Sequence, residues 1–256
     1  MMNWLQRVGS SFLLAGQVIL HLLQGRIHRR NTLEQLATVG LESLLIVLIT
    51  AVVISGVFTI QLAREFINFG ASSLIGGVLA IALARELTPV VTAVILAGRV
   101  GSAFAAELGT MKVTEQIDAL LLLRTDPVDY LVIPRVVASG LMLPVLTILS
   151  LLTGLVGGMI ICASAYNISS TVFLTSAQNL LTPWDLLVCC LKAMVFGVLI
   201  AIVGSNWGLS TSGGAKGVGR STTDAVVTAL LGVFVTNFLM SWLLFQGPGS
   251  ALSRAF

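Results

Sequence analysis

The sequence predicts an all-α integral membrane protein with an N-terminal interfacial helix, about five transmembrane helices and short cytoplasmic coupling helices. Composition is the first reason. The 256 residues are 56% hydrophobic and only 10% charged, whereas soluble domains carry about 25% charged residues. The second reason is a mean hydropathy of +1.00. The third is a set of apolar windows long enough for spanning helices, none of which alternates in polarity as barrel strands do.

The first 35 residues are predicted to form an interfacial helix and its lead-in to the membrane core. Met1–Gln24 is interrupted too often by polar side chains to cross a bilayer. A signal peptide is the alternative, but the basic run 28–30 follows the apolar part and no clear small-x-small cleavage site is present. Thr32 and Gln35 have the spacing of a capping box, so we expect the helix entering the first span to begin there.

Five apolar windows each meet the length of about 20 residues that a spanning helix needs. The third window contains no charge, whereas the second and fourth contain ionisable side chains. The windows are Leu41–Leu62, Ser73–Gly98, Val136–Ala163, Leu186–Trp207 and Ala225–Phe245. Glycines recur in the third and fourth windows, which indicates close helix packing. These glycines are Gly154, Gly157, Gly158, Gly197 and Gly204.

Two adjacent charges, Arg85 and Glu86, lie at membrane depth in the second window, shortly before Pro89. Each ionisable group there costs about 2.5–3.5 kcal/mol on insertion scales, so a chain that keeps both is expected to use them. One interpretation is a substrate cavity lined by Arg85, Glu86, Pro89 and Lys192. The alternative is structural. Adjacent helical residues point about 100° apart, so the two charges would link different neighbours, such as Lys192 or Asp185.

The connection between the second and third windows, about 105–135, is the most informative soluble segment. Apolar residues recur at helical spacing over 113–121, which predicts a short amphipathic helix. Asp126 and Pro127 have the order of an N-cap and a first helical residue, so we expect a second short helix after them. Acidic side chains outnumber basic ones in this segment, which favours a protein partner over a surface that faces anionic lipid.

The glycine-rich segment Gly213–Ser221 resembles a P-loop in which Arg220 replaces the lysine. A P-loop follows a strand in a soluble nucleotide-binding fold, whereas a membrane span precedes this segment. We therefore expect a flexible turn rather than a nucleotide site. Ser221 and Asp224 have the spacing of a helix N-terminus, so the last helix is predicted to begin there.

The distribution of basic residues predicts the orientation. A cytoplasmic N-terminus places most basic side chains on that side, and only Arg64 and Arg254 on the other. An odd number of spans then places the C-terminus on the opposite side. We expect a single domain over 1–256, with the membrane core at 36–256.

The sequence lacks the motifs of common enzyme classes. No Walker A motif, nucleophile elbow, HExxH zinc site or dinucleotide fingerprint occurs in a credible context. We therefore expect no enzymatic activity, no cofactor in this chain and an energy source elsewhere. No metal site is expected either, because His21 and His28 are isolated and the three cysteines have no metal spacing.

Other classes of function stay open from the residues alone. The buried charges could form the ion relay of a secondary transporter or channel, or they could be packing links in a structural membrane subunit. An intramembrane enzyme is less favoured, because no nucleophile and base have a convincing spacing. Five spans enclose little space, so a wide transport path would need a second copy or other subunits.

Several ordered stretches carry a family resemblance: Leu83–Val91, Leu96–Ala103 and Ala106–Gln116, with later similarity at Pro134–Arg135, Cys190–Phe196 and Gly219–Thr223. Over essentially its whole length the sequence resembles the MlaE-type permease family of ABC transporters. Members include the bacterial permease for phospholipid trafficking and the chloroplast permease of the trigalactosyldiacylglycerol type.

The resemblance implies a non-catalytic permease subunit that moves phospholipid or glycolipid between membranes as a homodimer. The implied partners are a second copy, an ABC ATPase dimer that binds ATP and Mg²⁺, an MCE-domain lipid-binding protein and membrane lipid, with no nucleic acid. The implied location is the bacterial inner (plasma) membrane or, alternatively, the plastid inner envelope. It also implies an ATPase-coupling element formed by Glu107, Gly109, Lys112, Glu115, Gln116 and Asp118.

Overall fold

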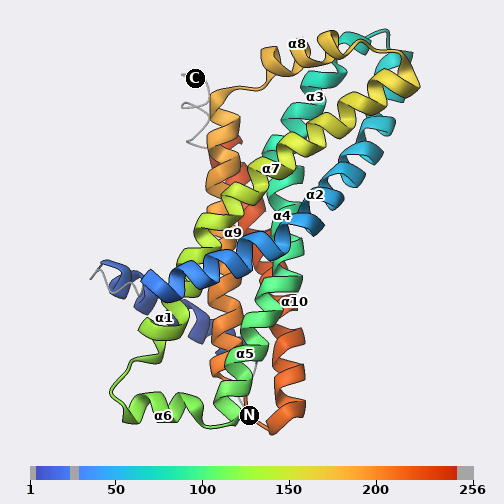
Figure 1. Cartoon of the computed structure of the whole chain (residues 1–256). Coiled ribbons are helices and arrows are strands. Elements are labelled where there is room, and N and C mark those ends of the chain that lie inside the picture. The colour runs from blue at the N-terminus through green and yellow to red at the C-terminus, as the bar shows by residue number, and fades with distance from the viewer. Residues whose placement is uncertain (1–3, 24–28, 247–256) are drawn as a thin grey trace. The chain divides into compact units, whose positions relative to one another are not determined.

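Helices form all of the regular structure in the residues that the computed structural model describes, which are 4–23 and 29–246 (Figure 1). Short π-helical turns join several of the α-helices. In chain order the elements are α1 Trp4–Leu23, α2 Arg29–Asn68, η1 Ser72–Leu74, α3 Ile75–Ala82, η2 Leu83–Leu87, α4 Thr88–Leu96, η3 Ala97–Gly101, α5 Ser102–Val113, α6 Gln116–Leu122, η4 Val128–Val132, α7 Ile133–Tyr166, α8 Ser170–Leu180, α9 Pro183–Leu209, α10 Gly214–Ser241 and η5 Trp242–Gln246.

Five stretches within the described part of the chain are long and apolar enough to cross a membrane, which confirms the predicted fold class. They are Arg29–Asn68, Ser72–Val113, Val128–Tyr166, Pro183–Leu209 and Gly214–Phe245. Each predicted window lies inside one of these stretches. The helices extend beyond the windows because polar residues at the window ends also continue a helix. The protein is therefore a multi-pass membrane protein.

Some predictions fall on residues 1–3, 24–28 and 247–256, which lie outside the described residues. These include the ends of the predicted N-terminal helix and the basic side chains of Arg26 and Arg254. The chain divides into two compact units. The first comprises Met1–Ser43, Ala93–Leu143 and Met194–Thr236, and the second comprises Leu44–Thr92, Pro144–Ala193 and Asn237–Phe256. The single-domain organisation stays a prediction.

Glycines bring helices into close contact in the first unit, as the sequence indicated. A β-carbon on Gly204 would lie 2.8 Å from the carbonyl oxygen of Gly101, and one on Gly197 would meet the carbonyl of Ser139. Only the absence of side chains lets these backbones approach so closely. The helix α1 is fixed to α9 by Asn206, whose Nδ2 donates to the carbonyl of Arg7 at 2.9 Å.

The second unit is organised in the same way around α3, and it contains a helix that the sequence analysis missed. The side chain of Ser55 in α2 donates to the carbonyl of Gly154 in α7 at 2.6 Å. The helix α8 packs against α3 (Figure 1). Gly76 leaves room there for the backbone of Phe173, whose ring is buried in the same core. Polar residues are frequent in 170–180, so the apolar face of α8 was not recognised in the sequence.

Two predicted helix starts are wrong. α2 begins at Arg29, so Thr32 lies inside the helix. α10 begins at Gly214, so the expected flexible turn is helical and Ser221 lies two turns inside it. The reason is that a hydroxyl can find a tertiary partner instead of capping a helix. The Oγ of Ser221 accepts a hydrogen bond from Nη1 of Arg7 at 3.3 Å.

The predicted cap at Asp126 is confirmed, because its carboxylate accepts a hydrogen bond from the N–H of Val128 at 2.8 Å. The separate second short helix is wrong. The chain continues from Val128 through η4 directly into α7, so this cap starts a spanning helix. Asp129, Pro134 and Arg135 interrupt the apolar residues after the cap, and the helix continues through all three.

Candidate functional site

Four charged side chains form a network between the π-turn η2 and the helix α9, within the second unit. Nε of Arg85 donates to Oδ1 of Asp185 at 2.7 Å. Nζ of Lys192 donates to Oε1 of Glu86 at 2.9 Å. Asp185 and Lys192 are seven residues apart, which is two helical turns, so both lie on one face of α9.

The contacts match the structural interpretation of the adjacent charges. Arg85 and Glu86 do link different partners, and these are the two residues that the sequence analysis had named. The helix is locally widened there, because the N–H of Thr88 bonds to the carbonyl of Leu83, five residues earlier. Such π-helical turns are rare and often accompany functional sites. A substrate cavity at these residues stays a prediction.

Pro89 explains why a lysine approaches the backbone at this point. In an α-helix the carbonyl of Arg85 would accept a hydrogen bond from the N–H of residue 89, and proline has none. Nζ of Lys192 donates to that carbonyl at 2.7 Å. The side chain of Lys192 is fully buried, so it does not extend to the membrane surface as an isolated lysine near a helix end would.

The last helix completes the network with residues that the sequence analysis did not identify. Oγ of Ser241 donates to Oε1 of Glu86 at 2.6 Å, and Nδ2 of Asn237 donates to Oε2 at 2.8 Å. The ring of Phe245 lies 4.6 Å from the guanidinium of Arg85. The available signal was two polar residues four apart in an apolar window, a spacing that places them on one helix face.

The two ends of each ion pair differ in exposure. The side chains of Asp185 and Lys192 are 0% exposed, whereas those of Arg85 and Glu86 are 36% and 44% exposed. The network pairs two positive with two negative charges, which lowers the free-energy penalty of holding them at membrane depth. Only Arg85 and Glu86 retain surface through which they could contact a ligand.

Asp185 also caps α9. Its Oδ2 accepts hydrogen bonds from the N–H of Thr182 at 3.0 Å and from its hydroxyl at 2.8 Å. The N–H of Asp185 in turn donates to the Thr182 hydroxyl at 3.3 Å. With Pro183 as the first helical residue, this is a capping box. The spacing of Thr182, Pro183 and Asp185 is a sequence signal from which this capping box could have been predicted.

The predicted coupling residues are divided between two helices of the first unit, α5 and α6. Glu107, Gly109 and Lys112 lie in α5, and Gln116 and Asp118 lie in α6. The joint between the helices is Glu115, whose φ of 61° is in the left-handed region. The predicted amphipathic helix is confirmed, but it begins at Gln116 because the chain turns sharply at Glu115.

Several of the charges in this segment are paired within the chain. Oε2 of Glu107 accepts a hydrogen bond from the buried Arg135 at 2.8 Å, which ties α5 to the start of α7. Lys112 and Asp118 form a 2.9 Å ion pair across the bend between α5 and α6. The segment is therefore braced internally.

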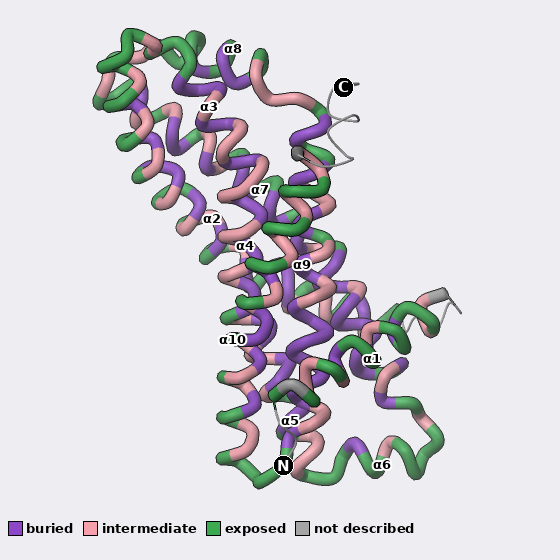
Figure 2. The backbone as a smooth tube through the Cα atoms, turned by 180° about the vertical axis from the view of Figure 1, so that it is seen from behind, coloured by how far each residue is buried: buried purple, intermediate pink, exposed green. Residues whose placement is uncertain are grey.

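The helix α6 has one buried apolar contact and a broad exposed surface (Figure 2). Ile117 packs with Leu108 of α5 and Leu131 of η4. Beyond it, the side chains of Leu122 and Leu123 are 87% and 75% exposed. Exposed leucines at the end of a helix in a loop are typical of a surface that a partner protein or membrane lipid covers.

His21 is not isolated as the sequence analysis had indicated. Its Nδ1 lies 2.5 Å from Oδ1 of Asp129, and Asp126 is close enough to join them in a three-residue group that could hold a metal ion. The His21–Asp129 contact is shorter than an ordinary N–H···O hydrogen bond. This contact ties α1 to η4 within the first unit.

Comparisons with known proteins identify one family over most of this chain. The family model described as Permease MlaE matches residues 32–243. A probable ABC transporter permease protein of Synechocystis sp. is 63% identical over 96% of this chain and 94% of its own length. The chloroplastic protein TRIGALACTOSYLDIACYLGLYCEROL 1 of Arabidopsis thaliana is 49% identical over 94% of this chain and 69% of its length.

A more distant relative, a probable ABC transporter permease protein of Rickettsia felis, is 37% identical over 94% of this chain and 93% of its own length. The family match covers most of the chain, including all five candidate spans in large part. The chain therefore belongs to the MlaE permease family, as an ABC transporter permease.

Proposed function

We propose that this permease is the membrane subunit of a lipid transporter, working as a homodimer with a separate ATPase and an MCE-domain lipid-binding protein. The observation that carries the proposal is the family match over residues 32–243. A lipid as the substrate is supported by the name of the Arabidopsis relative, which refers to trigalactosyldiacylglycerol. The ATP and Mg²⁺ would be bound by the ATPase partner.

The segment formed by α5, α6 and η4 supports a role in coupling to the ATPase. Its apolar centre at Leu108, Ile117 and Leu131 joins the ends of two spanning helices. The Glu107–Arg135 ion pair adds a second link between these helices. A partner that pressed on the exposed face of α6 would therefore move α5 and α7 together rather than deform a loose loop.

The charged network supports a role in the lipid path. Arg85 keeps more than a third of its side chain exposed while its Nε is bonded to Asp185, so its remaining donors can attract the phosphate or polar head group of a lipid. The exposed part of Glu86 would balance that charge. The buried pair on α9, Asp185 and Lys192, would hold both side chains in place.

The last candidate span supports a partner within the membrane. Only 17% of its most apolar window is buried inside the chain, compared with 56% for Pro183–Leu209. Phe238 and Trp242 are among its exposed side chains. This surface can be covered by acyl chains or by a second copy of the permease.

The direct test is purification of the chain with its native partners from membranes, followed by mass spectrometry of proteins and lipids. We expect stoichiometric amounts of an ATPase, an MCE-domain protein and two copies of the permease, with bound phospholipid or glycolipid. A functional assembly without any ATP-hydrolysing subunit would refute the proposal. Transport that required an ion gradient instead of ATP would favour a secondary transporter.

A further inference from the structure

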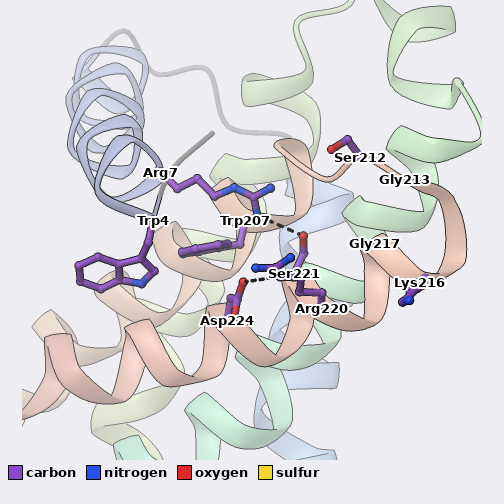
Figure 3. A pocket seen from close by; sticks show the side chains of 10 residues that line it. All are labelled: Trp4, Arg7, Trp207, Ser212, Gly213, Lys216, Gly217, Arg220, Ser221 and Asp224. Carbon is purple, nitrogen blue, oxygen red and sulfur yellow. Dashed lines mark hydrogen bonds and ion pairs between the residues drawn. The ribbon is translucent and has the colours of Figure 1, made fainter. Parts of the chain in front are cut away.

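A pocket of about 610 Å³ opens between α1, the end of α9 and the first turns of α10 (Figure 3). All of its lining residues belong to the first unit. Ser212 and Gly213 form part of its wall, and they connect the candidate spans Pro183–Leu209 and Gly214–Phe245. A connection between two spans lies where the chain leaves the hydrocarbon layer. The pocket therefore lies near the depth of lipid head groups.

The charges around the pocket favour an anion. Among the described lining residues, Arg7, Lys216 and Arg220 stand against the single carboxylate of Asp224. Asp224 does not neutralise this excess, because its 3.8 Å contact with Arg220 is long and the Arg220 side chain is 73% exposed. In Figure 3 Arg7 extends over Trp207 toward Ser221, and Lys216 lies at the edge of the group.

Two buried donors in the pocket lack an acceptor among the described residues. They are Nε of Arg7 and Nε1 of Trp207. Trp207 is 1% exposed, and the guanidinium of Arg7 lies 4.7 Å from its ring centroid. Buried N–H groups are almost always hydrogen-bonded. A tetrahedral oxyanion in the pocket would supply acceptor oxygens once either side chain turned its donor toward the pocket.

The backbone of α10 adds a further positive contribution. Gly213 and Gly214 have φ angles of 92° and 66°, which side chains rarely adopt. A β-carbon on Gly217 would collide with the carbonyl of Ser212. These glycines allow the connection to fold tightly against the first turn of α10. The pocket lies along the side of the first turns, from Lys216 to Asp224, near the positive end of the helix dipole.

A phosphate group fits this chemistry, and it could come from lipid or from solution. The helix α1 favours lipid, because the helix that supplies the pocket residues Trp4 and Arg7 also exposes a large apolar surface. Phe12 and Leu13 are 76% and 74% exposed, and the pocket residue Trp4 is 48% exposed. A helix with such a face lies in the membrane interface, where tryptophan is enriched.

We propose that this pocket binds the phosphate group of an anionic lipid from the surrounding leaflet. The site is separate in its residues from the charged network on η2 and α9, and it does not depend on which lipid is transported. Arg7 and Trp207 form its inner wall. Lys216 and Arg220 attract the head group at its rim.

Binding can be measured on the purified full chain in neutral detergent. Two of the four tryptophans line the pocket, so a Trp184→Phe/Trp242→Phe background reports on the pocket by fluorescence. The probes are dioctanoyl phosphatidylglycerol, dioctanoylglycerol and inorganic phosphate. We expect saturable binding of phosphatidylglycerol and none of dioctanoylglycerol. Equal affinity for inorganic phosphate would overturn the assignment to lipid.

Charge variants make the test specific. Lys216→Gln and Arg220→Gln should each weaken phosphatidylglycerol binding by about tenfold, whereas Asp224→Asn should strengthen it. Arg30→Gln is the matched control, because Arg30 is also exposed and pairs with an acid four residues later, Glu34. It should leave the affinity unchanged.

The double variant Lys216→Gln/Arg220→Gln is the decisive test of lipid binding. Both side chains are exposed, so the variant should still fold. Unchanged phosphatidylglycerol affinity in this variant overturns the proposal. If the variant instead lost a co-purifying protein subunit while lipid binding persisted, the pocket would be a protein interface and the proposal would again be wrong.

Discussion

Nζ of Lys192 donates a hydrogen bond to the backbone carbonyl of Arg85, the carbonyl that Pro89 leaves without its helical donor. The same ammonium group contacts Glu86 at 2.9 Å and Ser241 at 2.7 Å. All three of its donors are therefore used. One buried cation thus links an interrupted helix, an acid at membrane depth and the last helix of the second unit.

Replacement of Lys192 by Met should strongly destabilise the protein. The change removes three hydrogen bonds and leaves the half-exposed Glu86 without its cationic partner. Breaking a fully buried pair costs about 3–5 kcal/mol, so we expect a loss below that range. We expect a clear fall in the melting temperature of the purified chain, measured by circular dichroism. The double variant Glu86→Gln/Lys192→Met should recover part of the loss. If the loss of stability in the double variant equalled the sum of the losses in the two single variants, Glu86 and Lys192 would not be coupled.

Pro89→Ala should reduce the effect of losing Lys192. Alanine supplies the N–H that the carbonyl of Arg85 lacks, so this carbonyl no longer depends on the lysine. A double-mutant cycle of Pro89→Ala and Lys192→Met should give a coupling free energy of about 0.5–3 kcal/mol. Strict additivity of the two changes would show that Pro89 and Lys192 act independently.

Thr182→Ala should separate the two roles of Asp185. The variant removes the hydroxyl half of the capping box but leaves the Arg85–Asp185 ion pair in place, so we expect a loss of about 0.5–2 kcal/mol. Asp185→Ala removes both the cap and the pair and should cost more, because Arg85 loses its partner. Thermal unfolding of the two variants side by side gives the comparison. Equal losses would mean that the ion pair contributes nothing.

The spans could be predicted from sequence because hydropathy is a local property of about 20 consecutive residues. The partners of Glu86 could not. Asn237 and Ser241 are 151 and 155 residues away along the chain, and single polar residues in an apolar window do not reveal which neighbour they meet. For Asp185 and Lys192, the sequence indicated only that their charges and their membrane depth would allow them to pair with Arg85 and Glu86.

The errors in the helix starts have a common cause. A capping sequence is short, and Ser221 satisfies it while its hydroxyl accepts a hydrogen bond from Arg7 of α1 instead. The helix α8 was missed because its helical pattern in the sequence is weak. Its apolar face is short, and it is buried only because Gly76 and Gly77 leave space for it on α3. Tertiary contacts decided both cases.

Reversal of the exposed charges in η2 tests the lipid path. In the assembled transporter, Arg85→Glu places an acid opposite the buried Asp185, and Glu86→Arg places a cation opposite the buried Lys192. Each should lower lipid transfer between vesicles by more than tenfold, because the new charge repels a buried like charge that has lost its partner. The combined reversal should not restore transfer if Arg85 itself contacts lipid. Undiminished transfer by either single variant would remove these residues from the path.

Charge reversal on α6 should weaken ATPase association without destabilising the permease. Glu115, which immediately precedes α6, and Gln116, its first residue, are both exposed. Glu115→Lys therefore changes the surface that a partner would meet but not the contact of Ile117 with Leu108. Leu122→Asp should act in the same way, since that side chain is 87% exposed. We expect about tenfold weaker association in pull-down titrations for either variant. Glu65→Lys, an equally exposed reversal on α2, is the control and should bind normally. Normal binding by the α6 variants would place the ATPase contact elsewhere on the chain.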